Sequence, residues 1–210
     1  MGSDADEFKR LFPKDKIPII LSAIIQVGNI LRKKTVHDKE NWITRRLSAR
    51  LKQLPEFRDG PLAIHTKQEI LSDDYDSDYA AGEIDILVSS GLGSEVYFAI
   101  EAKRLHAYSP KGQFISGYSD YINEGMMRFI LGQYAPFMEN GAMLAYVFNG
   151  QTDSARAGVG KAIQKKAIEL RLVPPKQLIK SLLLLDSSID ETRHDLGNRS
   201  FTIHHLFLAV

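Results

Sequence analysis

Apolar and polar residues alternate in two neighbouring stretches in the middle of the chain, residues 83–88 and 95–103. One face of each stretch is apolar at every second position: Ile84, Ile86 and Val88 in the first, and Val96, Phe98, Ile100 and Ala102 in the second. A period of two predicts β-strands. Residues 89–94 between them are rich in serine and glycine, so an antiparallel pair joined by a turn is expected.

Apolar residues at helical spacing predict four helices, and shorter apolar runs predict the remaining strands. We expect helices at 16–34, 37–54, 118–140 (interrupted near Gly132 and Pro136) and 154–172, and strands at 62–71, 141–148, 182–186 and 201–210. The polar stretches 72–78, 104–117 and 187–199 are expected to be loops.

This order of elements predicts an α/β sandwich around a mixed central sheet. We expect a single domain over residues 1–210, with N-terminal helices in 16–54, a core in 62–148, and a C-terminal helix and strands in 154–210. The 210 residues, 44% of them hydrophobic, suffice for one sizeable core.

Composition excludes several classes of protein. The absence of cysteine excludes disulfides and thiolate metal sites. The sequence shows neither a long apolar span nor a signal peptide, so we expect a cytoplasmic protein with no membrane partner. The net charge is +1, so a nucleic-acid surface would have to come from local clusters of basic residues.

Candidate chemistry lies on the polar face of the predicted strand pair. Asp85, Glu101 and Lys103 share that face, whereas Ile84 and Ala102 point away from it. Neighbouring strands lie about 4.8 Å apart, so facing carboxylates repel each other unless a proton or a cation lies between them. Oxygen ligands favour a hard cation such as Mg²⁺. The alternative is a charged strand face exposed to water, which needs no ligand.

These residues resemble the motif of the PD-(D/E)XK nuclease superfamily, which has a restriction-endonuclease-like α/β/α fold. The resemblance is carried by Ile84-Asp85 and by Glu101-Ala102-Lys103 at the end of the next strand; Ile84 stands where the family has proline. It implies that Asp85, Glu101 and the backbone carbonyl of Ala102 bind Mg²⁺, with Mn²⁺ as a substitute. It also implies that Lys103 assists the attacking water and that cleavage leaves a 5′-phosphate.

The same resemblance suggests further site residues. Glu40, near the start of the predicted helix 37–54, is expected to join the catalytic group; the alternative is an acid placed there by the helix dipole. Arg128, Gln133 and Tyr134 are candidate substrate-binding residues, Arg128 because its guanidinium can grip two phosphate oxygens. The alternative for Arg128 is an ordinary surface arginine.

Other conspicuous residues receive structural interpretations. Trp42 is expected to pack rather than stack on a base, and His106 to be incidental to catalysis. His204 and His205 are adjacent on a predicted strand, so they face opposite sides and cannot share one metal.

The functional expectation is a divalent-metal-dependent nuclease that hydrolyses phosphodiester bonds. DNA is the expected substrate, endonucleolytic cleavage the expected mode, and prokaryotic defence or repair the expected setting. Sequence specificity is expected from a homodimer or a partner protein, because no separate target-reading region is visible in the sequence. The alternative is a non-catalytic subunit of the same fold that binds nucleic acid or a partner protein.

Overall fold

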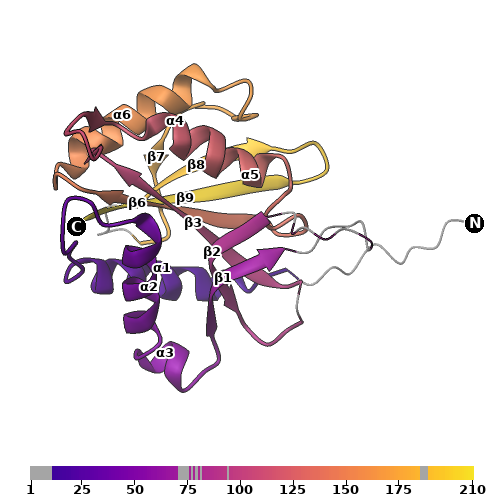
Figure 1. Ribbon diagram of the computed structural model, residues 1–210. Helices are drawn as coiled ribbons and strands as arrows, with labels where there is room; N and C mark the ends of the chain where they lie inside the picture. The colour runs from indigo at the N-terminus through magenta and orange to yellow at the C-terminus, as the bar shows by residue number, and fades with distance from the viewer. Residues whose placement is uncertain are drawn as a thin grey trace, which may run out of the picture.

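A mixed seven-stranded sheet forms the centre of the computed structural model, which describes residues 11–70, 76, 78, 80, 82–93, 95–184 and 189–210 (Figure 1). The strands follow the order β1-β2-β3-β6-β9-β8-β7. They are β1 (Ala63–Ile70), β2 (Gly82–Ser89), β3 (Tyr97–Leu105), β6 (Asn140–Val147), β7 (Ile179–Lys180), β8 (Asp190–Asp195) and β9 (Ser200–Ala209). A separate two-stranded hairpin consists of β4 (Ala107–Tyr108) and β5 (Phe114–Ile115).

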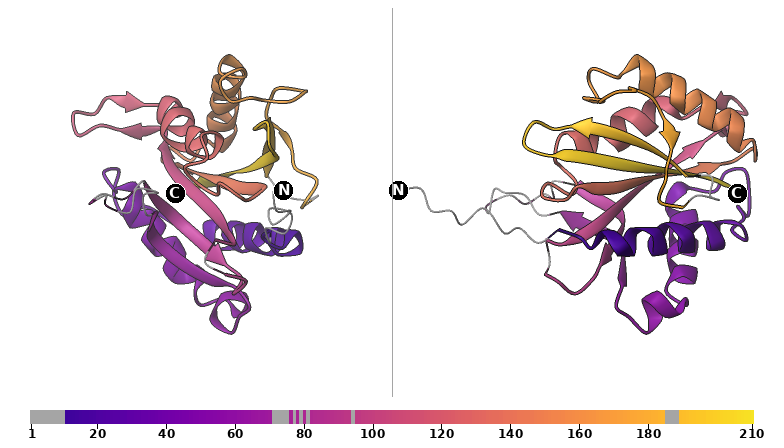
Figure 2. Two further views of the ribbon diagram at one scale, coloured as in Figure 1. Left: turned by 90° about the vertical axis from the view of Figure 1, so that its right-hand side faces the viewer. Right: turned by 180° about the vertical axis from the view of Figure 1, so that it is seen from behind.

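Helices cover both faces of the sheet. One side carries α1 (Ile17–Gly28), α2 (Glu40–Leu51) and α3 (Pro55–Arg58), and the other carries α4 (Tyr118–Tyr121), the π-helical turn η2 (Ile122–Met126), α5 (Met127–Ile130) and α6 (Thr152–Lys165), as Figure 2 shows. A short 3₁₀ turn, η1 (Lys14–Lys16), precedes α1. The expected α/β class is therefore confirmed.

The buried hydrophobic side chains of the described residues form one cluster that extends from Phe12 to Val210. It joins the helices of both layers to the sheet, as expected of a single folding unit. None of the helices in the described ranges has the length and apolar character needed to cross a membrane.

The predicted strand pair, β2 and β3, lies where the antiparallel part of the sheet meets the parallel part. Strands β1, β2 and β3 are antiparallel neighbours, which confirms the expected pairing of 83–88 with 95–103. Strand β3 then pairs in parallel with β6, and β6 with β9. Helices cover both faces of the sheet, and among the polar residues of β2 and β3 the side chains of Asp85 and Glu101 are buried.

All four predicted helices are shorter than expected. The helix expected at 16–34 is α1, which ends at Gly28, and the helix expected at 37–54 is α2, which spans Glu40–Leu51. The helix expected at 118–140 ends at Ile130, because Gly132 adopts φ +74°, a left-handed conformation that stops a helix. The helix expected at 154–172 spans Thr152–Lys165 instead. Beyond it the chain turns so that Leu172 bridges to His194 of β8, a tertiary pairing that overrides local helical preference.

Two expected loops and one expected strand are wrong. Residues 187–199 contain strand β8 instead of only a loop, and residues 104–117 contain the end of β3 and the β4–β5 hairpin. The strand expected at 182–186 is not formed by 182–184, where Leu182 is 73% exposed; the rest of it lies outside the described residues. Strand β8 was missed because its polar side chains are satisfied inside the sheet: Thr192 bonds to both His194 and His205.

Two glycines on α6 provide a matched test of its packing. A Cβ at Gly158 would lie 2.1 Å from the hydroxyl of Tyr118, which is itself hydrogen-bonded to His106, whereas a Cβ at Gly160 meets nothing within 4 Å. Gly160→Ala is expected to raise the free energy of unfolding by about 0.5–1 kcal/mol. Gly158→Ala is expected to lower it. Urea denaturation of both variants measures the two signs; equal stabilisation by both would contradict the packing of α4 on α6.

Candidate active site

Strands β2 and β3 separate at the position where Asp85 and Glu101 would face each other. Their ladder runs from Ser89–Tyr97 to Ile86–Ile100 and ends there. The next backbone N–H groups of β3 that point towards β2 are accepted by side chains instead. The N–H of Ala102 donates to Asp85 Oδ2 at 2.8 Å, and that of Arg104 donates to Glu40 Oε2 at 2.8 Å. Two carboxylates thus replace the missing backbone acceptors.

The backbone carbonyl of Ala102 points into the same gap. The carbonyl of Leu105 accepts from Phe148, the residue that follows β6, at 2.9 Å. In an extended strand, successive residues point their backbone groups to opposite sides, and the N–H and C=O of one residue point to the same side. The carbonyl of Ala102 therefore lies on the open side, next to its N–H and to Asp85. This is the orientation that the proposed metal ligand requires.

Asp85 and Glu101 are buried, each only 2% exposed. This excludes the alternative of a charged strand face in contact with water. Among the described residues, Glu101 Oε2 has no hydrogen-bond partner. Burial and the nearby charge of Asp85 raise the pKa of Glu101 to about 8, although Lys103 and Arg128 act in the opposite direction. A buried carboxylate with an unsatisfied oxygen is costly unless a proton or a cation binds it.

Three cationic side chains surround the two carboxylates. Lys103 Nζ lies 2.5 Å from Glu101 Oε1, and Arg128 Nη1 lies 3.5 Å from the same oxygen. The ammonium of Lys67 is hydrogen-bonded to Asp85 Oδ1 and lies 3.0 Å from Glu83 Oε1. Burial alone would lower the pKa of Lys67, but its contacts with Asp85 and Glu83 raise it. Positive charge from three separate elements therefore offsets the buried acids.

Lys67 is a site residue that the sequence analysis did not identify. It lies on β1 opposite Asp85, between the pairs Thr66–Ile86 and Gln68–Ile84. Its φ of +59° is left-handed, a conformation that costs a residue with a side chain on the order of 1–3 kcal/mol. The strand is thus distorted where its ammonium reaches the site. The sequence shows Lys67 within a predicted strand, but it does not show the register that places Lys67 opposite Asp85.

Helix α2 positions Glu40. Thr44 lies one turn further along the helix. Its hydroxyl is hydrogen-bonded to the hydroxyl of Tyr146 on β6 at 3.1 Å, and both side chains are buried. Residues four apart lie on one face of a helix, so Glu40 faces the sheet as well. Burial raises the pKa of Glu40, with the charge of Asp85 adding to the effect. Its hydrogen bond to β3 places it beside the site, in a role beyond that of a first-turn acid.

The three expected substrate-binding residues have different environments. Arg128 is partly exposed and contacts Glu101. Tyr134 is fully buried, and its hydroxyl donates to the carbonyl of Glu83 and accepts from Arg128. Tyr134 therefore holds Arg128 in place instead of contacting a substrate directly. Gln133 lies against β2, where its Nε2 would be 2.6 Å from a Cβ at Gly82.

The remaining conspicuous residues lie outside this group. His106 is buried, with its ring nitrogens bonded to Tyr118 at 2.6 Å and Asn149 at 3.1 Å, which is a structural role. The expectation for Trp42 is wrong: it is 47% exposed because it lies beside the apolar stripe of α2, with Lys39 Nζ 5.8 Å from its ring centroid. The acidic segment 72–78 falls mostly outside the described residues.

His204 and His205 face opposite sides of β9, as expected. His205 bonds to Tyr121 and Thr192, whereas His204 bonds to Asn140 and lies near Phe98.

The donor set fits a hard divalent cation. Where the strands separate, Asp85 Oδ2 accepts from the N–H of Ala102, and the preceding residue, Glu101, carries the unsatisfied Oε2. Carboxylate and carbonyl oxygens of this kind suit Mg²⁺ or Mn²⁺. Within the described ranges, no group of three or more acidic, histidine or cysteine side chains converges on one point. The fit therefore rests on two carboxylates and a backbone carbonyl, with Glu40 bound to the neighbouring N–H of Arg104.

Comparison of the chain with the models of known protein families, with curated proteins and with solved structures gave no match. The interpretation of the site therefore rests on the chain's own geometry.

Glu101 makes the stability of the metal-free protein depend on pH. Its pKa is about 8 in the folded protein and near 4.5 when unfolded. Between these two values the folded protein holds a proton that the unfolded chain has lost. The stabilisation that this proton provides is fully present below pH 4.5 and is lost as the pH rises through 8. In EDTA, stability is expected to decline over this range by at most about 1.4 kcal/mol per pH unit.

Glu101→Gln removes the titrating group, so its stability curve is expected to be flatter between pH 5 and 8. Urea denaturation at several pH values measures this. Parallel curves for the parent and the variant would show that Glu101 is not protonated in the folded protein.

Proposed function

We propose that this protein is a divalent-metal-dependent nuclease that hydrolyses phosphodiester bonds, with DNA as its substrate. The observation that carries the proposal is the separation of β2 and β3, which brings Asp85, Glu101 and the Ala102 backbone together inside the protein. Lys103 lies directly beside Glu101. A buried acid with a raised pKa next to a cation, as Glu101 is next to Lys103, is typical of catalytic sites.

Each residue has a separate task in the proposed reaction. Asp85, Glu101 and the carbonyl of Ala102 hold the cation, and Mg²⁺ or Mn²⁺ bound there would polarise the phosphate and lower the pKa of a water molecule. Glu40 fixes the β3 backbone beside this point through the N–H of Arg104. Lys103 donates a hydrogen bond to the attacking water or to the phosphate, where negative charge develops.

The reaction is an in-line hydrolysis. The oxygen of water forms a bond to phosphorus and gives up a proton, the bond from phosphorus to the 3′ oxygen breaks, and the 3′ oxygen takes up a proton. The products are a 5′-phosphate and a 3′-hydroxyl. Arg128, held by Tyr134 and close to Glu101, is the candidate to bind a non-bridging phosphate oxygen.

A surface cavity gives a substrate access to Lys103 and Glu40. It has a volume of about 420 Å³ and reaches from the start of α2 to the β4–β5 hairpin. Its lining includes Glu40, Lys103 and Arg104. Ile115 of the hairpin lines the cavity and is 43% exposed. A nucleic-acid backbone can therefore approach Lys103 without unfolding any element.

Metal-dependent cleavage tests the proposal directly. The purified protein is incubated with supercoiled DNA, linear duplex, single-stranded DNA and RNA, each with Mg²⁺, Mn²⁺ or EDTA. We expect cleavage of DNA with either metal and none in EDTA. Nicking or linearisation of supercoiled DNA would indicate an endonuclease. Binding without cleavage under all conditions would favour the non-catalytic alternative.

Lys103 has a role in the reaction that is separable from folding and metal binding. Lys103→Met keeps the apolar stem and removes the ammonium. The turnover rate is expected to fall by about 10²- to 10³-fold, the typical effect of losing one group that stabilises charge in the transition state. Mg²⁺ binding, measured by calorimetry, is expected to be no weaker than in the parent, because the variant lacks a positive charge that repels the cation.

The matched control is Lys161→Met, an exposed lysine on α6, which should cleave at the parent rate. A folded Lys103→Met protein that binds Mg²⁺ and cleaves within about threefold of the parent rate, against the loss expected here, would remove Lys103 from the reaction.

A further inference from the structure

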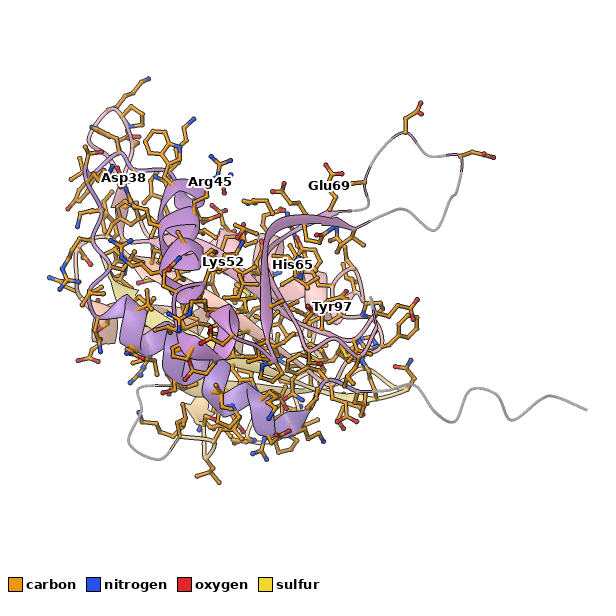
Figure 3. The ribbon with its side chains drawn as sticks, turned by 90° about the horizontal axis from the view of Figure 1, so that it is seen from below. Asp38, Arg45, Lys52, His65, Glu69 and Tyr97 are labelled. Atoms are coloured by element: carbon orange, nitrogen blue, oxygen red, sulfur yellow. The ribbon has the colours of Figure 1, made fainter. Side chains whose placement is uncertain are left out.

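A second polar cavity lies beside the candidate active site, between α2 and β1. It has a volume of about 280 Å³ and is lined by Arg45, Ser48, Ala49, Lys52, Thr66 and Lys67. Three of these side chains are cations and two are hydroxyls, and none is acidic. Figure 3 shows Arg45 and Lys52 along α2 next to the strand that carries His65. The cavity thus combines positive charge with hydrogen-bond donors.

Ser48 provides an independent sign that this cavity binds a ligand. The residue is 2% exposed, and its Oγ has no hydrogen-bond partner among the described residues. A buried hydroxyl without a partner is destabilising. An acceptor oxygen in the cavity would satisfy it. Since Ser48 lines the cavity, the unsatisfied donor belongs to the wall of this site.

Two of the three cations of the cavity have no ion-pair partner among the described residues, whereas the third, Lys67, is paired with Asp85 and Glu83. In the described part of the chain, Arg45 and Lys52 form neither an ion pair nor a side-chain hydrogen bond, unlike Arg46, which binds Asp38. Lys67 connects the cavity to the active site, because its ammonium is bonded to Asp85. The ligand is therefore an anion with several acceptor oxygens, adjacent to the acids of the site.

We propose that this cavity binds a phosphate group of the nucleic-acid strand that is being cleaved. Arg45 and Lys52 neutralise its charge, and the hydroxyls of Ser48 and Thr66 donate to its oxygens. This inference rests on the proposed function for the identity of the ligand. It adds a binding site lined by Lys67, whose ammonium is bonded to Asp85. A phosphate bound in the cavity would fix the position of the nucleic-acid strand relative to the cleavage site.

Nucleic-acid binding in EDTA tests this site without turnover. A fluorescent oligonucleotide is titrated with the parent protein, Arg45→Gln, Lys52→Gln and the double variant at several salt concentrations. Each lost phosphate contact is expected to reduce the slope of log K against log salt by about 0.7–0.9 and to weaken binding roughly tenfold. Arg50→Gln, on the same helix but outside the cavity, is the control with the same change of charge.

Ser48→Ala separates binding from structure. If the hydroxyl is only a buried polar group, its removal leaves affinity unchanged. In the proposed site, Ser48→Ala leaves thermal stability unchanged or raises it, and weakens binding several-fold. Oligonucleotides with a 5′-phosphate or a 5′-hydroxyl, together with competition by inorganic phosphate, distinguish an internal phosphate from a terminal one.

The two proposals fail in different ways. If the parent protein binds nucleic acid and the Arg45 and Lys52 variants match the Arg50→Gln control in affinity and salt slope, the phosphate site is wrong while the nuclease proposal stands. If the variants lose binding but the parent never cleaves, the phosphate site stands and the nuclease proposal is wrong. An unchanged affinity in Ser48→Ala would remove Ser48 from the site.

Discussion

The site depends on the separation of two neighbouring strands in the middle of a sheet. After the Ile86–Ile100 pair, β3 loses its partner on one side but continues to pair with β6 on the other. A buried backbone N–H without an acceptor is costly, and here the carboxylates of Asp85 and Glu40 accept the N–H groups of Ala102 and Arg104. The requirement to satisfy the backbone therefore brings acidic groups to one place and leaves the Ala102 carbonyl open beside them.

The second constraint is charge. Asp85 and Glu101 are buried, and the protein offsets them with Lys67, Lys103 and Arg128 from three different elements. The offset is incomplete, because the pKa of Glu101 remains raised to about 8 and its Oε2 has no partner within the described ranges. A proton or a bound cation would satisfy this oxygen. The arrangement of charges is also consistent with a basic cavity next to Lys67, which extends positive charge away from the acids along α2.

The sequence pattern predicted the α/β class, the β2–β3 pair and the grouping of Asp85, Glu101 and Lys103, because the period of two fixes which side chains share a face. It did not predict Lys67, since the register between β1 and β2 depends on a connection that the pattern cannot resolve. Strand β8 was missed because a buried network around Thr192 makes a polar sequence compatible with a central position. The role of Tyr134 was also hidden, as its burial follows from packing on β2.

The central claim is that the gap between β2 and β3 is a metal site, and a crystal structure with Mn²⁺ tests it most directly through the anomalous signal of the metal. We predict a peak in contact with Asp85, Glu101 and the carbonyl of Ala102, with the ammonium of Lys67 displaced from Asp85. A structure at saturating Mn²⁺ in which Lys67 still binds Asp85 and no peak lies between the strands would contradict the account.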